Sequence, residues 1–159
     1  MNDLHDHGPR VRVALMSPSE DSRLQFPGLI DTGADMTAVD EALIKQLGYR
    51  PHGGVEVVTA NGSQERSLYK VVLRFPREPG AKEEVTVDMV VAGLPKFGHD
   101  NIRALLGRDL LAMAQFNYHG PSGRFGLVFP QAAQVGVAGV VLGGSAPVRR
   151  GPVWIGRGL

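Results

Sequence analysis

Short runs in which apolar and polar residues alternate recur along the chain, and they predict a set of β-strands. Val11, Val13 and Leu15 are separated by single residues, which is the period-two pattern of a half-buried strand. The same alternation is found in residues 69–75, 85–91 and 125–129, and an apolar run over 26–30 adds another candidate. The 21 Gly and 11 Pro residues divide the chain into short segments, so the pattern favours a mostly β fold.

Two turns connect neighbouring predicted strands. Asn61-Gly62 lies between β-forming residues, and both residue types tolerate positive φ, so this pair predicts a tight hairpin. Residues 118–124 contain Gly, Pro and Ser, and they predict a second turn between two strands.

Two short helices are predicted in addition to the strands. Asp40 is a good N-cap for a helix over 41–47, and Gly48 is a good residue to end it. The second helix is expected over 108–115, where apolar residues recur at helical spacing.

The chain has 159 residues, 43% of them apolar, which fits one domain with additional terminal segments. We expect an N-terminal arm over 1–8, one domain over 9–130 and a C-terminal tail over 131–159. The tail is rich in Gly, Ala, Val and Pro and has no clear period. We interpret it as mobile, or as ordered only by a partner.

Charge and composition exclude several classes of function. The net charge of +1 argues against nucleic acid and anionic membranes as partners. The absence of cysteine excludes disulfides, thiolate zinc sites and cysteine nucleophiles. His5 and His7 form no complete metal site, so neither a metal nor a cofactor is expected. No signal peptide or membrane span is recognised, and a cytoplasmic location is expected.

Candidate chemistry is concentrated in two short motifs. Leu29-Ile30 leads into Asp31-Thr32-Gly33, a tripeptide that occurs once in the chain and that could by itself be an ordinary turn. The second motif, Leu-Leu-Gly-Arg-Asp, occupies residues 105–109 and follows the predicted Asn-Gly hairpin.

Together these motifs resemble the retroviral-type aspartic peptidases, the retropepsins, in their cellular or bacterial form. In that family two apolar residues precede Asp-Thr-Gly, and a later motif of two apolar residues and a glycine opens a short helix. The resemblance covers roughly residues 9 to 130. It implies a closed β-barrel or sandwich subunit with one or two short helices, forming a two-fold dimer. It therefore implies both a reaction, peptide-bond hydrolysis, and an assembly, the homodimer.

The resemblance also implies a role for each matching residue. Asp31 corresponds to the catalytic carboxylate, Thr32 to the residue that joins the two active-site loops across the dimer, and Gly33 to the tight turn. Ala34 and Asp35 correspond to residues that bind the substrate backbone.

Two further roles follow from the same resemblance. Asp35 is expected to pair with Arg108, and the resemblance favours a buried structural pair over an exposed surface ion pair. Ala60, Asn61 and Gly62 correspond to the flap that closes over the substrate. This flap contains fewer glycines than the viral form does.

Amide hydrolysis without a metal or a covalent nucleophile requires one group to activate water and another to protonate the leaving nitrogen. Two carboxylates about 3 Å apart cannot both ionise, so they share one proton; aspartic proteases as a class illustrate this. One chain supplies one Asp31, so the expected function is an aspartic endopeptidase that cleaves polypeptides as a homodimer. The alternative is a catalytically inactive module of the same fold that dimerises or binds peptides.

Overall fold

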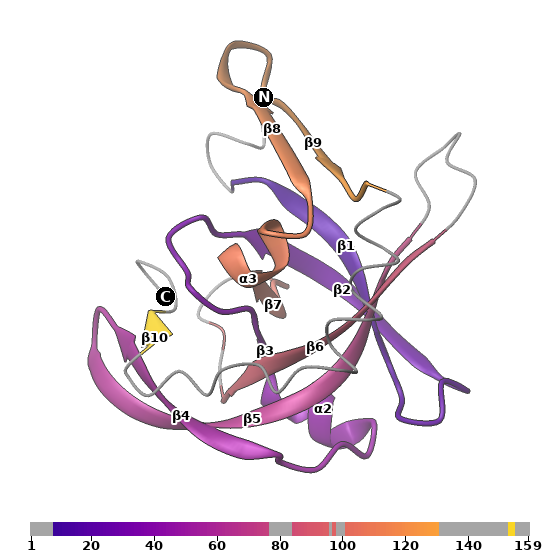
Figure 1. Ribbon diagram of the computed structural model, residues 1–159, viewed down its shortest axis with the longest axis vertical. Helices are drawn as coiled ribbons and strands as arrows, with labels where there is room; N and C mark the ends of the chain where they lie inside the picture. Colours follow the sequence, from indigo (N-terminus) through magenta and orange to yellow (C-terminus); the bar gives the residue numbers. More distant parts are fainter. Residues whose placement is uncertain (1–7, 77–83, 96, 98–100, 131–152, 155–159) are drawn as a thin grey trace.

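The computed structural model describes residues 8–76, 84–95, 97 and 101–130, together with the backbone of Val153–Trp154 (Figure 1). Most of the described residues lie in β-strands. In chain order the elements are β1 (Arg10–Met16), β2 (Arg23–Ile30), β3 (Ala38–Asp40), α2 (Glu41–Gln46), β4 (Gly53–Thr59), β5 (Gly62–Phe75), β6 (Val85–Leu94), β7 (Ala104–Leu106), α3 (Arg108–Leu111), β8 (Gln115–His119), the 3₁₀-helix η1 (Gly120–Ser122), β9 (Arg124–Val128) and β10 (Val153–Trp154).

Six of the strands close into a barrel. They follow the order β1-β2-β7-β3-β6-β5, and a further pairing between β1 and β5 completes the ring. β4 and β10 extend the sheet beyond β5, whereas β8 and β9 form a separate two-stranded sheet. The prediction of a mostly β, closed-barrel subunit with two short helices is therefore confirmed. The two-fold dimer stays a prediction, because the structure contains a single chain.

β5 is the longest strand, and its two halves have different partners. Residues Gly62–Leu68 pair with β4 as a hairpin, and residues from Leu68 to Phe75 pair with β6. The alternation seen in the sequence matches the burial of this second half, because Tyr69, Val71, Leu73 and Phe75 all face the core. One strand therefore joins the barrel to a hairpin that extends from it.

The α2 helix agrees with the prediction, whereas the α3 helix is shorter than predicted. The Asp40 side chain accepts a hydrogen bond from the Ala42 N–H at 2.9 Å, and Gly48 adopts a φ of +90° beyond the C-cap. The predicted second helix over 108–115 was wrong at its end, since α3 stops at Leu111. The reason is competition from the β8–β9 hairpin, in which Gln115 already pairs with Val128.

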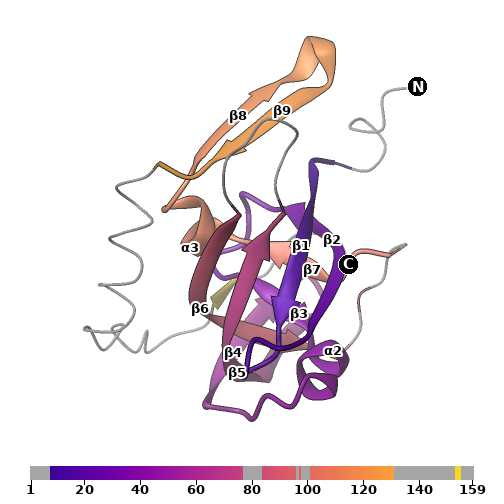
Figure 2. The ribbon, with the colours of Figure 1, turned by 90° about the vertical axis from the view of Figure 1, so that its right-hand side faces the viewer.

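Both predicted hairpins are present. In the β4–β5 hairpin Thr59 pairs with Gly62, but only Gly62 takes a positive φ, of +112°, and Asn61 does not. The Asn-Gly pair therefore marks the turn, with a backbone conformation that differs from the expected one. The β8–β9 hairpin projects from the barrel at the end opposite α2 (Figures 1 and 2).

The C-terminal tail lies almost wholly outside the described residues, so the interpretation of residues 131–159 is not tested. The backbone of Val153–Trp154 pairs in parallel with Val57 and Val58 of β4. No helix in the described ranges is long and apolar enough to cross a membrane.

Candidate active site

The two sequence motifs meet side by side in the barrel. β2 and β7 pair in parallel, with Leu29 opposite Leu105 and Ile30 opposite Leu106. The N–H of Asp31, the residue that follows β2, donates a hydrogen bond to the Leu106 carbonyl at 3.0 Å. The apolar pairs of both motifs are strand residues, and their pairing brings Asp31 to the strand that leads into α3.

The loop that begins at Asp31 is fixed by hydrogen bonds to itself and to α3. The Gly33 N–H donates to Asp31 Oδ1 at 2.9 Å, and the Ala34 N–H donates to the Asp31 carbonyl at 3.1 Å. The Arg108 N–H donates to the Ala34 carbonyl at 2.9 Å. Ala34 is buried and Asp31 is half-buried, whereas Thr32 and Gly33 are exposed. The Asp-Thr-Gly tripeptide therefore lies at the surface of the single chain.

A buried polar contact joins the far end of this loop to α3, and sequence reasoning missed it. Thr37 donates to the Asp109 carboxylate with its N–H at 2.9 Å and with its hydroxyl at 2.7 Å. The Thr37 oxygen in turn accepts from the Gly107 N–H at 3.1 Å, and the Leu110 N–H donates to Asp109 at 2.8 Å. The Thr37 N–H, the Thr37 hydroxyl and the Leu110 N–H all donate to Asp109, so the arrangement suits an ionised carboxylate.

Burial raises the pKa of Asp109, while the hydrogen bonds from Thr37 and Leu110 oppose that rise. Thr37 is fully buried and Asp109 is half-buried, so the contact is largely shielded from water. The signal in the sequence was Asp109 itself, an acidic residue in the first turn of a predicted helix, where free N–H groups favour negative charge.

Gly107 allows the two segments to approach each other closely. A Cβ atom at this position would lie 2.6 Å from the Met36 carbonyl carbon and 2.9 Å from the Thr37 nitrogen. These are backbone atoms, so a larger residue would displace the loop. The glycine of the second motif is therefore required by packing, and its φ of −85° needs no special freedom.

Asp35 and Arg108 form an ion pair, as the resemblance implied. The Asp35 side chain is 22% exposed and the Arg108 side chain 59% exposed. The pair is therefore much more open to water than the buried pair that the sequence favoured, because Arg108 lies on the outer side of α3 while Asp109 points inward.

The predicted flap residues lie at the tip of the β4–β5 hairpin, and all three are exposed. The Thr59 hydroxyl oxygen accepts from the Asn61 N–H at 3.2 Å and donates to the Gly62 carbonyl at 3.3 Å. Thr59 therefore shapes the tip, and a hydroxyl residue directly before the turn was the signal for it. Toward the base of the hairpin, Val55 and Val57 pack in a core cluster with Ala38 and Leu105 from the strands beside the loop.

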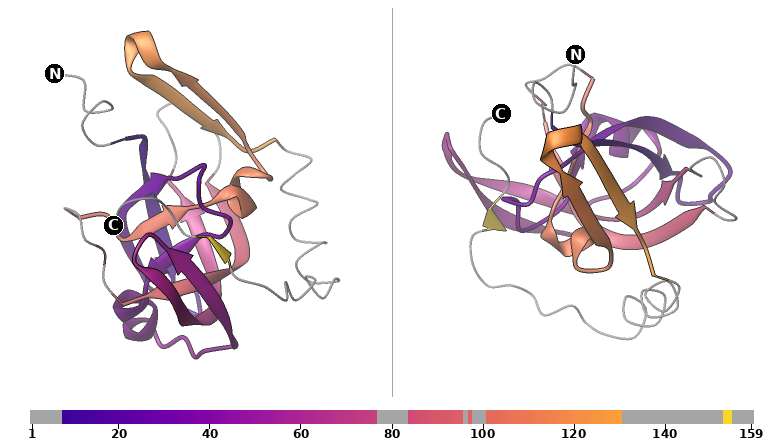
Figure 3. Two further views of the ribbon diagram at one scale, coloured as in Figure 1. Left: turned by 90° about the vertical axis from the view of Figure 1, so that its left-hand side faces the viewer. Right: turned by 90° about the horizontal axis from the view of Figure 1, so that it is seen from above.

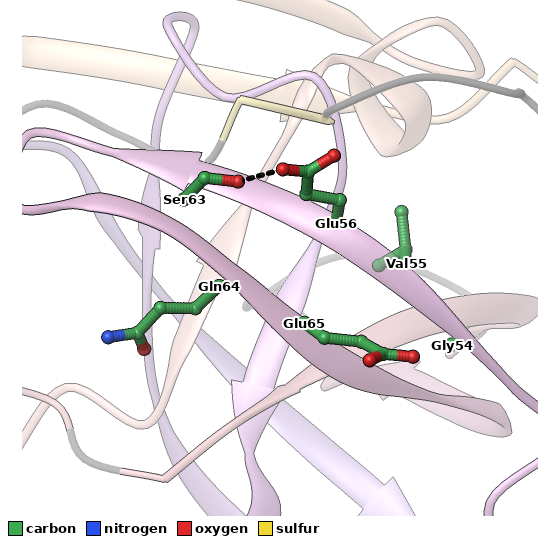
Figure 4. Close-up of a pocket in the computed structure, with 6 residues that line it drawn as sticks. All are labelled: Gly54, Val55, Glu56, Ser63, Gln64 and Glu65. Atoms are coloured by element: carbon green, nitrogen blue, oxygen red, sulfur yellow. Dashed lines mark hydrogen bonds between the residues drawn. The ribbon is translucent and has the colours of Figure 1, made fainter.

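Asp31 lines neither of two open hollows on the described surface. One is lined by Arg12, Gln25, Phe26 and Pro27. The other lies on the β4–β5 hairpin, where Figure 4 shows the Ser63 hydroxyl directed toward the Glu56 carboxylate, to which it donates a hydrogen bond. Within the described ranges, no three or more His, Asp or Glu side chains gather closely enough to hold a metal ion.

Comparison with known proteins places the chain in a family. The family described as Aspartyl protease matches residues 20–110, more than half of the chain and both motifs, and the chain belongs to that family. This confirms the resemblance drawn from the two motifs. A comparison with curated proteins gave no match.

Solved structures similar to this chain include two viral proteases. The solution structure of Simian Foamy Virus (mac) protease has a TM-score of 0.43 and 17% identity, covering 65% of this chain and 92% of that one. EIAV protease complexed with the inhibitor HBY-793 has a TM-score of 0.43 and 24% identity, covering 65% of this chain and 85% of that one.

Proposed function

We propose that the protein is an aspartic endopeptidase whose active site forms between two copies of the chain. The observation that carries this proposal is the placement of Asp31. Its carboxylate is oriented by the Gly33 N–H, its backbone is fixed to β7, and its tripeptide lies exposed at the surface. One such loop supplies one carboxylate, and the chemistry of the family needs two. A second copy related by a two-fold axis supplies the other.

The proposed mechanism assigns opposite protonation states to two identical groups. Two Asp31 carboxylates held close together cannot both ionise, so the pair retains one proton. The ionised Asp31 takes a proton from water, which attacks the scissile carbonyl, while the protonated Asp31 donates a hydrogen bond to that carbonyl oxygen. The Asp31 that took this proton then donates it to the leaving nitrogen as the C–N bond breaks, so that a carboxylic acid and an amine are formed and the pair again holds one proton.

Other residues of the loop position the substrate and the partner. Ala34 and Asp35, at the end of the loop nearest α3, bind the main chain of an extended peptide. Thr32 is exposed in the single chain and is free to bond the partner loop. Position 33 has little space for a side chain, because a Cβ atom there would lie 3.2 Å from Asp31 Oδ1.

The β4–β5 hairpin is proposed as the flap. Ala60, Asn61 and Gly62 at its exposed tip close over the peptide and exclude bulk water. An extended substrate is then held by main-chain hydrogen bonds to the flap on one side and to the active-site loop on the other. In this way the peptide binds as an added β-strand.

The test is cleavage of a peptide library by the purified chain at mildly acidic pH, with Asp31→Asn as the control. We expect cleavage by the wild type and none by the variant, with both giving the same far-ultraviolet circular dichroism. Cleavage that persists in the variant would assign the activity elsewhere. A folded wild type that binds peptides without cleaving them would instead favour an inactive peptide-binding module. A rate that climbs steadily into alkaline pH would contradict a dyad that must hold one proton.

A further inference from the structure

The β4–β5 hairpin, proposed as the flap, carries a third strand on its outer edge. β4 and β10 are the last two strands of the eight-stranded sheet, and they run parallel to each other. Val153 of β10 lies opposite Val57, and Trp154 lies opposite Val58. These two β4 residues directly precede Thr59, which shapes the hairpin tip. A segment of the C-terminal tail therefore pairs with the flap next to its tip.

The edge that β10 occupies lies by the catalytic loop. Figures 1 and 3 show β10, in yellow, beside the β4–β5 hairpin and near the loop over residues 31–37 that joins β2 to β3. Val57 is fully buried and belongs to the same core cluster as Ala38 of β3 and Leu105 of β7. β3 begins where the loop ends, and β7 pairs with the strand that leads into the loop. β10 therefore pairs with the part of the hairpin where the proposed function places an extended substrate.

The outer edge of β4 is suited to main-chain pairing. In the described part of the chain β10 is the strand that covers this edge, and without it β4 would end the sheet. β4 has one charged residue, Glu56, and contains no Lys or Pro, the residues that commonly prevent an edge strand from pairing. Main-chain N–H and C=O groups are common to all peptides, so an edge that pairs with the tail can also pair with a substrate strand. The tail and the substrate are therefore alternative occupants of one edge.

Charge also favours the tail as an occupant of this edge. Glu56 lies opposite Glu65 in the β4–β5 register, and both residues are exposed. Like charges directly opposite each other destabilise a pair of strands. Residues 131–159 contain Arg149, Arg150 and Arg157 and no Lys, Asp or Glu, so every charged side chain of this segment is positive. A basic strand partner offsets the repulsion between the two glutamates.

We propose that the tail inhibits the enzyme from within the same chain, with β10 occupying the edge of the flap to which an extended substrate binds. This inference rests on the proposed function, because it takes the β4–β5 hairpin as the flap that holds the substrate. Tethering makes the binding of the tail intramolecular, so even a short pairing competes at a high effective concentration. Substrate binding then requires the release of β10. The apparent affinity for substrate falls in proportion to the fraction of molecules in which the edge is free.

The first measurement tests the pairing of β10 in the full chain. Neighbouring residues of a strand direct their N–H groups to opposite sides, so Val153→Pro combined with Trp154→Pro removes the donor that faces β4. The control combines Val140→Pro with Val141→Pro, two neighbouring tail residues outside β10. Hydrogen exchange of β4 is followed by mass spectrometry. We expect faster exchange in the β10 variant than in the wild type and the control.

The second measurement is cleavage of a peptide selected from the library. We expect the β10 variant to have a KM about threefold or more below that of the wild type, with kcat unchanged, because the tail competes with substrate without altering Asp31. A synthetic peptide of residues 148–159 should inhibit the β10 variant competitively. If the proline variant fails to fold, Val153→Glu combined with Trp154→Glu gives the same reading through repulsion from Glu56 and Glu65.

The outcomes separate this inference from the proposed function. Unchanged exchange of β4, an equal KM after the edge is freed, or an equal gain in the Val140 and Val141 control would each overturn the inference and leave the endopeptidase intact. If no chain cleaves peptides, the endopeptidase is wrong, and the binding of a fluorescent peptide of residues 148–159 to the same chains is measured by anisotropy. Tighter binding to the β10 variant alone would support competition by the tail, and equal binding to all chains would overturn it.

Discussion

Thr37 and Asp109 are 72 residues apart in the sequence and are joined by three hydrogen-bond contacts, at 2.7, 2.9 and 3.0 Å. Thr37 ends the loop that begins at Asp31, and Asp109 lies in the first turn of α3. This contact, rather than the more exposed pair of Asp35 and Arg108, is the buried link between the loop and the helix.

Thr37→Val is expected to destabilise the protein by about 1–3 kcal/mol, because the Asp109 carboxylate and the Gly107 N–H each lose a partner in a buried site. Val has nearly the shape of Thr, so the effect reports the hydroxyl. The measurement is urea unfolding followed by circular dichroism. Thr86→Val, at an exposed position of β6, is the matched control, with an expected change within about 0.5 kcal/mol. Equal effects at the two positions would contradict a structural role for the Thr37 hydroxyl.

Asp109→Asn is expected to change how stability depends on pH. Burial raises the pKa of Asp109 above its ordinary value of 3.8, so the folded chain binds this proton more tightly than the unfolded chain does. Its contribution to the free energy of unfolding therefore falls as pH rises from 3.8 to the raised pKa. Asn cannot ionise, so the stability of the variant relative to the wild type should increase across that window.

Urea unfolding of both proteins at several pH values measures this difference. Asp21→Asn provides a control of opposite sign, because a hydrogen bond from Ser17 lowers the pKa of Asp21. There the wild type gains stability relative to the variant as pH rises through the lowered pKa toward 3.8. A constant difference between Asp109→Asn and the wild type at every pH would show that Asp109 titrates alike in the folded and unfolded chains.

Arg108→Gln is expected to change the free energy of unfolding by less than about 1 kcal/mol, since solvent-exposed ion pairs contribute little. Its side chain is 59% exposed beside Asp35. The same urea titration used for Thr37→Val allows a direct comparison, and Arg124→Gln, at an exposed position of β9, is the control. A loss as large as that of Thr37→Val would mean that the Asp35 pair, too, holds the loop to α3.

The sequence predicted those features of the fold that repeat locally. Alternating residues marked β1, β5, β6 and β9, and the caps Asp40 and Gly48 marked α2. Both hairpins were placed by their turn residues, because a turn is decided by a few neighbouring residues. The predicted helix extended as far as Gln115, but Gln115 belongs to strand β8. The pairing of β8 with β9 therefore decided where α3 ends.

The sequence predicted those residues of the candidate site that belong to a recognised motif, and it predicted the other residues only in part. Asp31 and Arg108 were recognised from the residue types around them. Thr37 was not, because it lies in an irregular loop, and its partner Asp109 comes close only through the parallel pairing of β2 with β7. Such contacts depend on which residues lie opposite each other in paired strands, and a single sequence does not show this register.

Gly107→Ala is expected to destabilise the protein by roughly 1–3 kcal/mol, since its Cβ would overlap the backbone of Met36 and Thr37. Peptidase activity should fall as well, because the displaced segment carries the Asp31 loop. Gly53→Ala is the control: a Cβ there would meet only the end of the Leu68 side chain, at 4.0 Å. Thermal unfolding and cleavage rate together are the readout. Wild-type behaviour of Gly107→Ala would show that the loop can move aside at no cost.

Mixing subunits tests whether two copies of Asp31 share one site. Wild type is allowed to exchange subunits with a roughly threefold excess of Asp31→Asn, and exchange is confirmed by native mass spectrometry. If each site needs one carboxylate from each copy, random pairing leaves activity per wild-type subunit at about a quarter of its starting value. The control is the same excess of additional wild type in place of Asp31→Asn, which should leave activity per wild-type subunit unchanged. Activity that is undiminished after confirmed exchange would mean that one chain holds a complete site, and the requirement for a second Asp31 would be lost.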